Sequence, residues 1–187
     1  MKKFLEKWQW LIALLSAAGL ITVALTKNPV KTAVQNTVSD LKSETKIMQL
    51  HPAAREAARK FLNSAEAAGF KLRVTSSYRD YAEQNKLYAQ GRTSPGAIVT
   101  NAKGGQSYHN FGLALDVVPL VAGVPDWQTS QWPQIAAIGK AAGFAWGGDF
   151  KSFIDKPHFQ LNTGLTLAQL QTRHATGQTD NGYVLLT

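Results

Sequence analysis

The chain has 187 residues, with 20 Lys and Arg against 12 Asp and Glu and no cysteine. This length accommodates one domain of ordinary size with an appendage. Because 44% of the residues are hydrophobic and only 17% are charged, we expect a folded domain with a buried core. The absence of cysteine excludes disulfides, thiolate metal sites, iron–sulfur clusters and cysteine nucleophiles.

The net charge of +8 is compatible with an anionic partner, such as nucleic acid, acidic lipid or an anionic cell-wall polymer. No run of five or six Lys and Arg occurs, and no basic run is interleaved with aromatic residues. Basic runs and interleaved aromatic residues are typical of nucleic-acid-binding proteins. Because this sequence lacks both, we do not expect a nucleic-acid partner.

The N-terminal region predicts a membrane segment. Residues 8–26 carry no charged side chain, and their 19 residues just span a hydrocarbon core of about 30 Å as a helix. Lysines in residues 1–7 favour a cytoplasmic N-terminus, and Trp8 and Trp10 suit the membrane interface. We therefore expect a single-pass cytoplasmic membrane protein whose remaining residues lie on the periplasmic or cell-wall side.

The membrane segment also offers small residues of the signal-peptidase type at Ser16-Ala17-Ala18. Cleavage there would leave an apolar run exposed, which favours a retained signal anchor over residues 8–26. The segment resembles the signal-anchor-release segments of some phage endolysins. Residues 27–46 are polar and indicate a linker or juxtamembrane helix.

Helix and strand signals alternate over residues 47–187. Capping residues and apolar periodicity predict helices from Pro52 to Gly69, from Asp80 to about Gln90, from Trp132 to Ala142 and from Thr166 to about Arg173. Strands are predicted over 70–75, 113–118 and 158–161, with a long loop over 93–106. The fold class is therefore α+β, with a domain over 47–163 and a C-terminal helix and tail over 164–187.

Two histidines and one aspartate suggest a metal site. His109, Asp116 and His158 would supply two imidazoles and one carboxylate, a set that suits a catalytic zinc ion with one open position. Asp116 lies in an apolar strand, where a buried carboxylate needs a metal, hydrogen-bond donors or a cation such as Arg79. Asp155, three residues before His158, suits a general base or an ordinary turn residue.

Four blocks of the chain resemble, in order, the signature blocks of the LAS-type zinc peptidases. They are SSYRDYAEQNKLY over 76–88, SYHNFGLALD over 107–116, WGGDF over 146–150 and DKPHF over 155–159. The resemblance covers about residues 50–161. The last block is similar to that of the L-alanyl-D-glutamate endopeptidases of phage endolysins and bacterial cell-wall hydrolases, whereas carboxypeptidase relatives carry Glu at the position of Asp155.

This resemblance implies a small antiparallel sheet with flanking helices and one zinc ion per chain, bound by His109, Asp116 and His158. It implies that Asp155 is the catalytic acid and base. Arg79 would stabilise the oxyanion of the tetrahedral intermediate, or form a salt bridge within the domain.

The resemblance also suggests substrate-binding residues, which are Ser107, Gln84 and Tyr88; packing of the helix is an equal alternative for Tyr88. The implied function is that of a membrane-tethered zinc metallopeptidase that hydrolyses peptidoglycan stem peptides, at the L-Ala-D-Glu bond, with peptidoglycan and the membrane as partners. The alternatives are a D-alanyl-D-alanine carboxypeptidase and a zinc-containing wall-binding module without catalysis.

Overall fold

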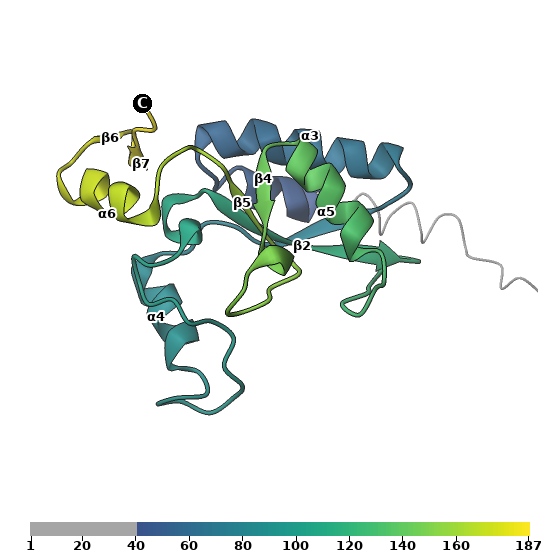
Figure 1. Ribbon diagram of the computed structural model, residues 1–187, viewed down its shortest axis with the longest axis horizontal. Coiled ribbons are helices and arrows are strands. Elements are labelled where there is room, and N and C mark those ends of the chain that lie inside the picture. Colours follow the sequence, from purple (N-terminus) through teal and green to yellow (C-terminus); the bar gives the residue numbers. More distant parts are fainter. Residues whose placement is uncertain (1–40) are drawn as a thin grey trace, which may run out of the picture. The chain divides into compact units, whose positions relative to one another are not determined.

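In the computed structural model, which describes residues 41–187, five strands form one antiparallel sheet (Figure 1). The central strand β2 (Ala114–Val121) pairs with β1 (Leu72–Ser76) on one edge and with β5 (His158–Leu161) on the other. Beyond β5 lies β4 (Phe144–Trp146), and the short β3 (Val124–Pro125) folds back onto the end of β2. The predicted α+β class with a small antiparallel sheet is confirmed.

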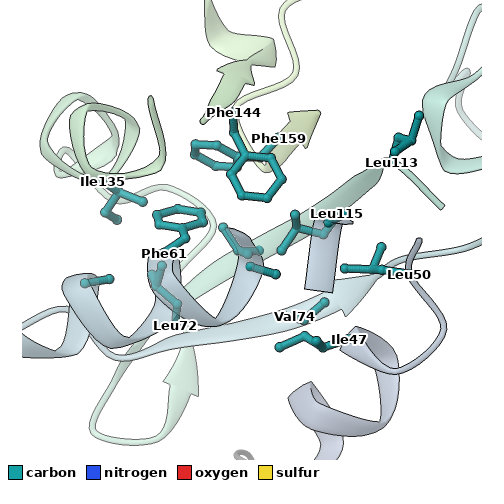
Figure 2. Close-up of a cluster of buried hydrophobic side chains, with 14 of the residues drawn as sticks. Ile47, Leu50, Phe61, Leu72, Val74, Leu113, Leu115, Ile135, Phe144 and Phe159 are labelled. Carbon is teal, nitrogen blue, oxygen red and sulfur yellow. The ribbon is translucent and has the colours of Figure 1, made fainter. Parts of the chain in front are cut away.

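Two helices cover one face of the sheet and enclose the core (Figure 2). Phe61 of α3 (Pro52–Ala67) packs against Phe159 of β5, with ring centroids 4.7 Å apart. Ile135 of α5 (Trp132–Ala141) joins the same cluster. Gly139 of α5 permits close packing, because a Cβ there would lie 2.5 Å from the ring of Phe159. The core therefore fixes α5 directly over β5.

Two capping residues that predicted helices act as expected. Asp80 caps α4 (Tyr81–Ala89), and Thr166 forms a capping box with Gln169 at α6 (Leu167–Ala175). Helix α3 is capped by the side chain of His51, which accepts a hydrogen bond from the Ala53 amide. Helix α4 and the long loop after it project to one side of the sheet (Figure 1). Two 3₁₀ helices complete these connections, η1 (Tyr108–Phe111) before β2 and η2 (Gly147–Asp149) after β4.

The domain begins earlier in the chain than residue 47, where the sequence analysis placed the end of the linker and the start of the domain. Residues 41–47 are helical, Ile47 belongs to the core, and Ser43 is buried. The Ser43 hydroxyl accepts a hydrogen bond of 3.1 Å from the backbone amide of Val74 in β1. Part of the expected linker over 27–46 therefore packs as a piece of the domain, a contact that its polar composition does not reveal.

The expected membrane segment over 8–26 lies outside the described residues. Within residues 41–187, none of the helices combines the length and the apolar character needed to cross a bilayer.

The C-terminal region forms more than the expected helix and tail. After α6, the strands β6 (Thr179–Asp180) and β7 (Tyr183–Val184) form a hairpin that packs beside the start of α3. The Tyr183 hydroxyl accepts a hydrogen bond of 2.5 Å from Nη2 of Arg55, and Val184 is buried in the core. These strands have two residues each, too few for a periodic pattern to predict them.

The bond from Val74 to Ser43 gives a test of the domain boundary. Ser43→Ala leaves a buried backbone amide without its acceptor, so we expect a loss of about 1–3 kcal/mol in the free energy of unfolding. This loss lowers Tm by about 2–12 °C in a domain of this size, measured by circular dichroism.

The control for this test is Ser64→Ala, which makes the same chemical change on the exposed face of α3. It should change the free energy of unfolding by less than about 0.5 kcal/mol. An equal Tm for both variants would show that residues 41–47 do not unfold together with the sheet.

Candidate metal centre and active site

Three side chains from three elements converge on the sheet face opposite the helices. Asp116 and His158 are directly paired in the register of β2 and β5, while His109 comes from η1, just before β2. Their neighbours Leu115 and Phe159 pair one step along and point into the core. Because alternate residues of a strand face opposite sides, the core packing of Leu115 and Phe159 directs Asp116 and His158 to the other face.

The three converging atoms have the spacing of metal ligands. Nε2 of His109, Oδ1 of Asp116 and Nδ1 of His158 lie 3.2 Å from one another in every pairing. In a tetrahedral zinc site, bonds of about 2.0–2.1 Å place neighbouring ligand atoms about 3.3–3.4 Å apart. The triangle therefore fits three corners of a tetrahedron and leaves the fourth corner for a ligand that is not from the protein.

The hydrogen bonds of the two imidazoles fix which nitrogen carries the proton. Nδ1 of His109 lies 2.5 Å from the carbonyl oxygen of Ser77, an acceptor, so this nitrogen donates. Nε2 of His158 lies 3.1 Å from Oε1 of Gln160 and donates in the same way. The two other ring nitrogens then present lone pairs toward a carboxylate oxygen. Three acceptors at this spacing repel one another unless a proton or a metal ion lies between them, and two imidazole nitrogens with one carboxylate oxygen are a donor set that fits a bound metal ion.

The charges around the cluster favour the forms that bind metal. Burial lowers the pKa of His109, although the nearby Asp116 opposes that shift. Burial alone would raise the pKa of the Asp116 carboxyl, but both imidazoles outweigh it and hold that pKa well below its usual value. Burial also acts to lower the pKa of His158, yet the hydrogen bond with Asp116 prevails and raises it. Asp116 is therefore ionised, and protons compete with a metal mainly at His158.

Arg79 supports the cluster from the side of Asp116. Its Nη2 lies 3.2 Å from Oδ2 of Asp116, while its Nη1 donates to Oε1 of Gln84 at 2.9 Å. A third bond, from Nε to the Ser76 hydroxyl at 3.2 Å, fixes the plane of the guanidinium. The ion pair that the sequence offered as one explanation for Asp116 is thus present together with the histidine cluster.

Asp155 lines the same cavity as the metal cluster and Arg79. No residue within 41–187 donates a hydrogen bond to its carboxylate, and burial, followed by the charge of Asp116, raises its pKa. Gly147 explains how its backbone is held, because the Asp155 amide donates to the Gly147 carbonyl at 3.0 Å. A Cβ on Gly147 would lie 2.4 Å from the Asp155 carbonyl oxygen, so this close approach requires glycine.

The three residues expected to bind substrate lie at different depths. Ser107 lines the cavity, and its hydroxyl caps η1 by accepting the His109 amide at 3.3 Å. Gln84 is fully buried and joins Arg79 to the Ala102 carbonyl of the long loop. The ring of Tyr88 lies under the guanidinium of Arg92, 4.1 Å from the centroid. The structure therefore brings Ser107 to the cavity, while Gln84 and Tyr88 support the wall behind it.

Sequence reasoning missed several residues that line the cavity, which has a volume of about 770 Å³; Gln160 and Trp127 are two of them. Gln160 follows His158 by two positions on the same strand, so the period of a strand could have placed it beside the cluster. Trp127 lies in the connection between β3 and α5, where no pattern indicates a direction for the side chain.

Comparison with known proteins identifies the family. A family profile described as D-alanyl-D-alanine carboxypeptidase matches residues 100–161. The peptidoglycan L-alanyl-D-glutamate endopeptidase CwlK of Bacillus subtilis is 37% identical over 137 residues, which cover 68% of this chain and 80% of CwlK. The chain belongs to the LAS-type peptidase family. This finding confirms the resemblance of the four sequence blocks.

Two further LAS-type relatives are similar to this chain. The L-alanyl-D-glutamate peptidase of a Listeria phage is 31% identical over 124 residues, which cover 65% of this chain and 41% of the phage protein. The crystal structure of the L-Ala D-Glu endopeptidase ChiX of Serratia marcescens superposes with a TM-score of 0.52 at 29% identity. That superposition covers 66% of this chain and 88% of ChiX.

The contact between His158 and Gln160 predicts an effect on metal affinity. Gln160→Leu removes the acceptor that holds Nε2 protonated and orients the ring, so we expect zinc affinity to fall about 10- to 100-fold. Gln160→Glu keeps an acceptor and should retain the affinity. Competition with a chromophoric chelator measures both values.

The matched control for Gln160 is Gln134→Leu on the exposed face of α5, which should leave zinc affinity unchanged. If Gln160→Leu binds zinc as tightly as the unchanged chain, Gln160 has no role in orienting His158.

Zinc binding by this cluster is also expected to depend on pH. A metal must displace protons from the two lone-pair nitrogens, and the raised pKa of His158 makes this nitrogen the first to hold a proton as the pH is lowered. The lowered pKa of His109 delays its own competition to more acidic solution. Calorimetric titration in buffers of different ionisation enthalpy should therefore show that zinc binding releases more protons as the pH is lowered. Binding without proton release would contradict the ligand assignment.

Proposed function

We propose that this peptidase uses zinc to hydrolyse the L-Ala-D-Glu bond of peptidoglycan stem peptides. The observation that carries the proposal is the equal spacing of three ligand atoms, from His109, Asp116 and His158, in one cavity with Asp155 and Arg79. The relatives named as L-alanyl-D-glutamate endopeptidases support the choice of bond. The block around Asp155 supports it as well, because it has the form of the endopeptidase branch.

Zinc held by these three residues would supply Lewis acidity, which makes water a stronger nucleophile and polarises the scissile carbonyl group. The two imidazoles bind as neutral ligands, since their outer nitrogens donate to Ser77 and Gln160. Asp116 supplies the single negative charge of the ligand set.

Asp155 is the general base and then the general acid of the proposed reaction. Its carboxylate takes a proton from the attacking water and returns it to the nitrogen of the leaving D-Glu residue. A carboxyl group in water holds protons too weakly for the second step. Burial and the charge of Asp116 raise the proton affinity of Asp155, and its free oxygens leave it available for both transfers.

Arg79 stabilises the negative charge that develops on the carbonyl oxygen. Its bonds to Asp116, Gln84 and Ser76 use three of the five N–H groups of a guanidinium and fix its orientation before substrate arrives. Two N–H groups remain for the substrate at the cavity wall. A cation held in this way stabilises developing charge without the cost of reorientation.

Two other functions are considered for the same site, a carboxypeptidase and a wall-binding module without catalysis. The description of the family profile favours removal of a terminal D-Ala by a carboxypeptidase. A zinc-containing wall-binding module would need neither a free carboxylate at Asp155 nor an oriented Arg79, so both residues favour an enzyme.

The proposal also includes attachment of the domain to the outer side of the cytoplasmic membrane. It rests on the uncharged run over residues 8–26, with lysines on both sides of the run. Attachment would hold the domain close to the wall, and the net charge of +8 would favour anionic wall polymers.

Digestion of purified peptidoglycan by the full chain in mild detergent tests the reaction. With zinc, mass spectrometry should detect released peptides that begin with D-Glu, and a chelator should abolish their release. Asp155→Asn should retain zinc and lose about 100- to 10,000-fold in turnover. Asp180→Asn, the same change at an exposed position of the C-terminal hairpin, should retain both.

The products separate the alternatives from the proposal. Loss of the terminal D-Ala alone would identify a carboxypeptidase. Zinc binding and wall binding without any released peptide, unaffected by Asp155→Asn, would identify a binding module.

A further inference from the structure

Trp127 is an exposed aromatic residue within the catalytic cavity. Its side chain is 49% exposed and lines the same cavity as Asp116, Asp155 and His158. Among the described residues it has no hydrogen bond, ring contact or cation above its face. The two other described tryptophans differ, since Trp132 is buried in the core and Trp146 donates to the Lys156 carbonyl at 2.7 Å.

The backbone around Trp127 is held firmly in place. Ala122 and Gly123 have φ of 53° and 81°, the left-handed values that suit a tight turn between β2 and β3. After this turn, the Asp126 amide donates to the Pro119 carbonyl at 2.9 Å, and the Gln128 amide donates to Oδ1 of Asp126 at 3.2 Å. Hydrogen bonds at the residues on both sides of Trp127 therefore hold its backbone in place beside the cavity.

These bonds also place Trp127 relative to the metal cluster. On β2, the Val117 amide donates to the carbonyl of Pro157, which directly precedes the ligand His158. Two residues along the same edge of β2, Pro119 accepts from Asp126, so the two contacts lie about 7 Å apart. The backbone next to Trp127 therefore contacts β2 one short step beyond the contact that holds Pro157, and the Trp127 side chain lines the cavity of the metal cluster.

The covalent structure of the proposed substrate places a sugar at a similar distance. In peptidoglycan the nitrogen of L-Ala is acylated by the lactyl group of N-acetylmuramic acid. One amino acid and one lactyl unit separate the scissile carbonyl from the sugar, at about 3.8 Å per unit, so the ring begins about 7–8 Å away. An enzyme that cuts after L-Ala must accommodate this sugar close to its metal.

The lining of the cavity includes two kinds of side chain. Arg79, Gln106 and Ser107 offer a cation and polar groups, which suit the carboxylate of D-Glu and the rest of the acidic stem. Trp127, Phe150 and Phe153 offer aromatic faces. The C–H groups of a sugar ring pack well on the face of an indole, and the indole N–H can bond to the acetamido group.

We propose that Trp127 forms a subsite for the N-acetylmuramyl sugar next to the scissile bond. The enzyme then recognises the glycan-linked form of the stem peptide and discriminates against free peptides of the same sequence. This inference rests on the proposed cleavage of the L-Ala-D-Glu bond. Because Trp127 is half exposed and unpartnered, its replacement should not disturb the core.

The kinetic test compares two substrates with the zinc-loaded full chain. One is an N-acetylmuramyl stem peptide, and the other is the same peptide with an acetyl group in place of the sugar. We expect the unchanged enzyme to favour the muramyl peptide about 10- to 100-fold in kcat/KM. Trp127→Ala should lower this ratio at least tenfold, mainly through KM, and Trp127→Phe should keep part of it.

The control variant is Val124→Ala, an exposed position of the same hairpin that should leave the ratio unchanged. Equal kcat/KM for the two substrates in the unchanged enzyme would overturn the inference. So would a Trp127→Ala variant that loses the same factor on both substrates, because that pattern indicates a general effect on cavity shape.

A binding measurement tests the subsite independently of catalysis. Calorimetry with N-acetylmuramyl-L-alanine and with N-acetyl-L-alanine should show tighter binding of the muramyl compound, and Trp127→Ala should remove the difference. If neither peptide is hydrolysed but this difference is present, the proposed bond is wrong and the sugar subsite stands. Equal binding of both compounds overturns the subsite whatever the enzyme cleaves.

Discussion

The close approach of three metal-binding atoms is the constraint on which the rest of the site depends. Two imidazole nitrogens and a carboxylate oxygen face one another at 3.2 Å, an arrangement that needs a proton or a metal ion between them. The hydrophobic core holds them there. Leu115 and Phe159 pair across β2 and β5 and pack into the core beneath α3 and α5, so their neighbours Asp116 and His158 must point to the opposite face. The buried core thus holds three ligand atoms at the spacing that a metal ion requires before any ion binds.

The two residues proposed for catalysis, Asp155 and Arg79, each contact one of the proposed metal ligands directly. The His158 amide donates to the Asp155 carbonyl at 3.2 Å, and Gly147 holds the same turn, so the backbones of the proposed base and of His158 are joined directly. On the other side, Arg79 bonds directly to Asp116. The residues that would move a proton and stabilise charge therefore keep their positions relative to the metal through single short contacts, which is the preorganisation that an enzyme of this kind requires.

The sequence predicted the features whose cause is local. Caps at Asp80 and Thr166 depend on neighbouring residues alone, so the helices they begin were placed within a residue or two. The three candidate metal ligands, which the structure brings together, were predicted from their residue types and from the resemblance of the sequence blocks. Other features depend on contacts between distant segments, which no local pattern encodes. Burial of Ser43 requires β1 beside it, and the inward position of Gln84 requires both Arg79 and the loop at Ala102. Trp127 reaches the cavity only because β3 pairs with β2.

The charges in the cavity indicate which species the site is built to stabilise. With neutral imidazoles, a bound divalent zinc ion, ionised Asp116 and Asp155 and the cation of Arg79 would sum to one positive charge. Transfer of a proton from the attacking water to Asp155 would leave this total unchanged. It would move one negative charge from the Asp155 carboxylate toward the carbonyl oxygen, where the cation of Arg79 is proposed to stabilise it. Interactions that strengthen along the reaction accelerate it, whereas uniform binding does not. A sugar on Trp127 would add binding energy that is the same at every stage, which suits a recognition role at a distance from the reacting atoms.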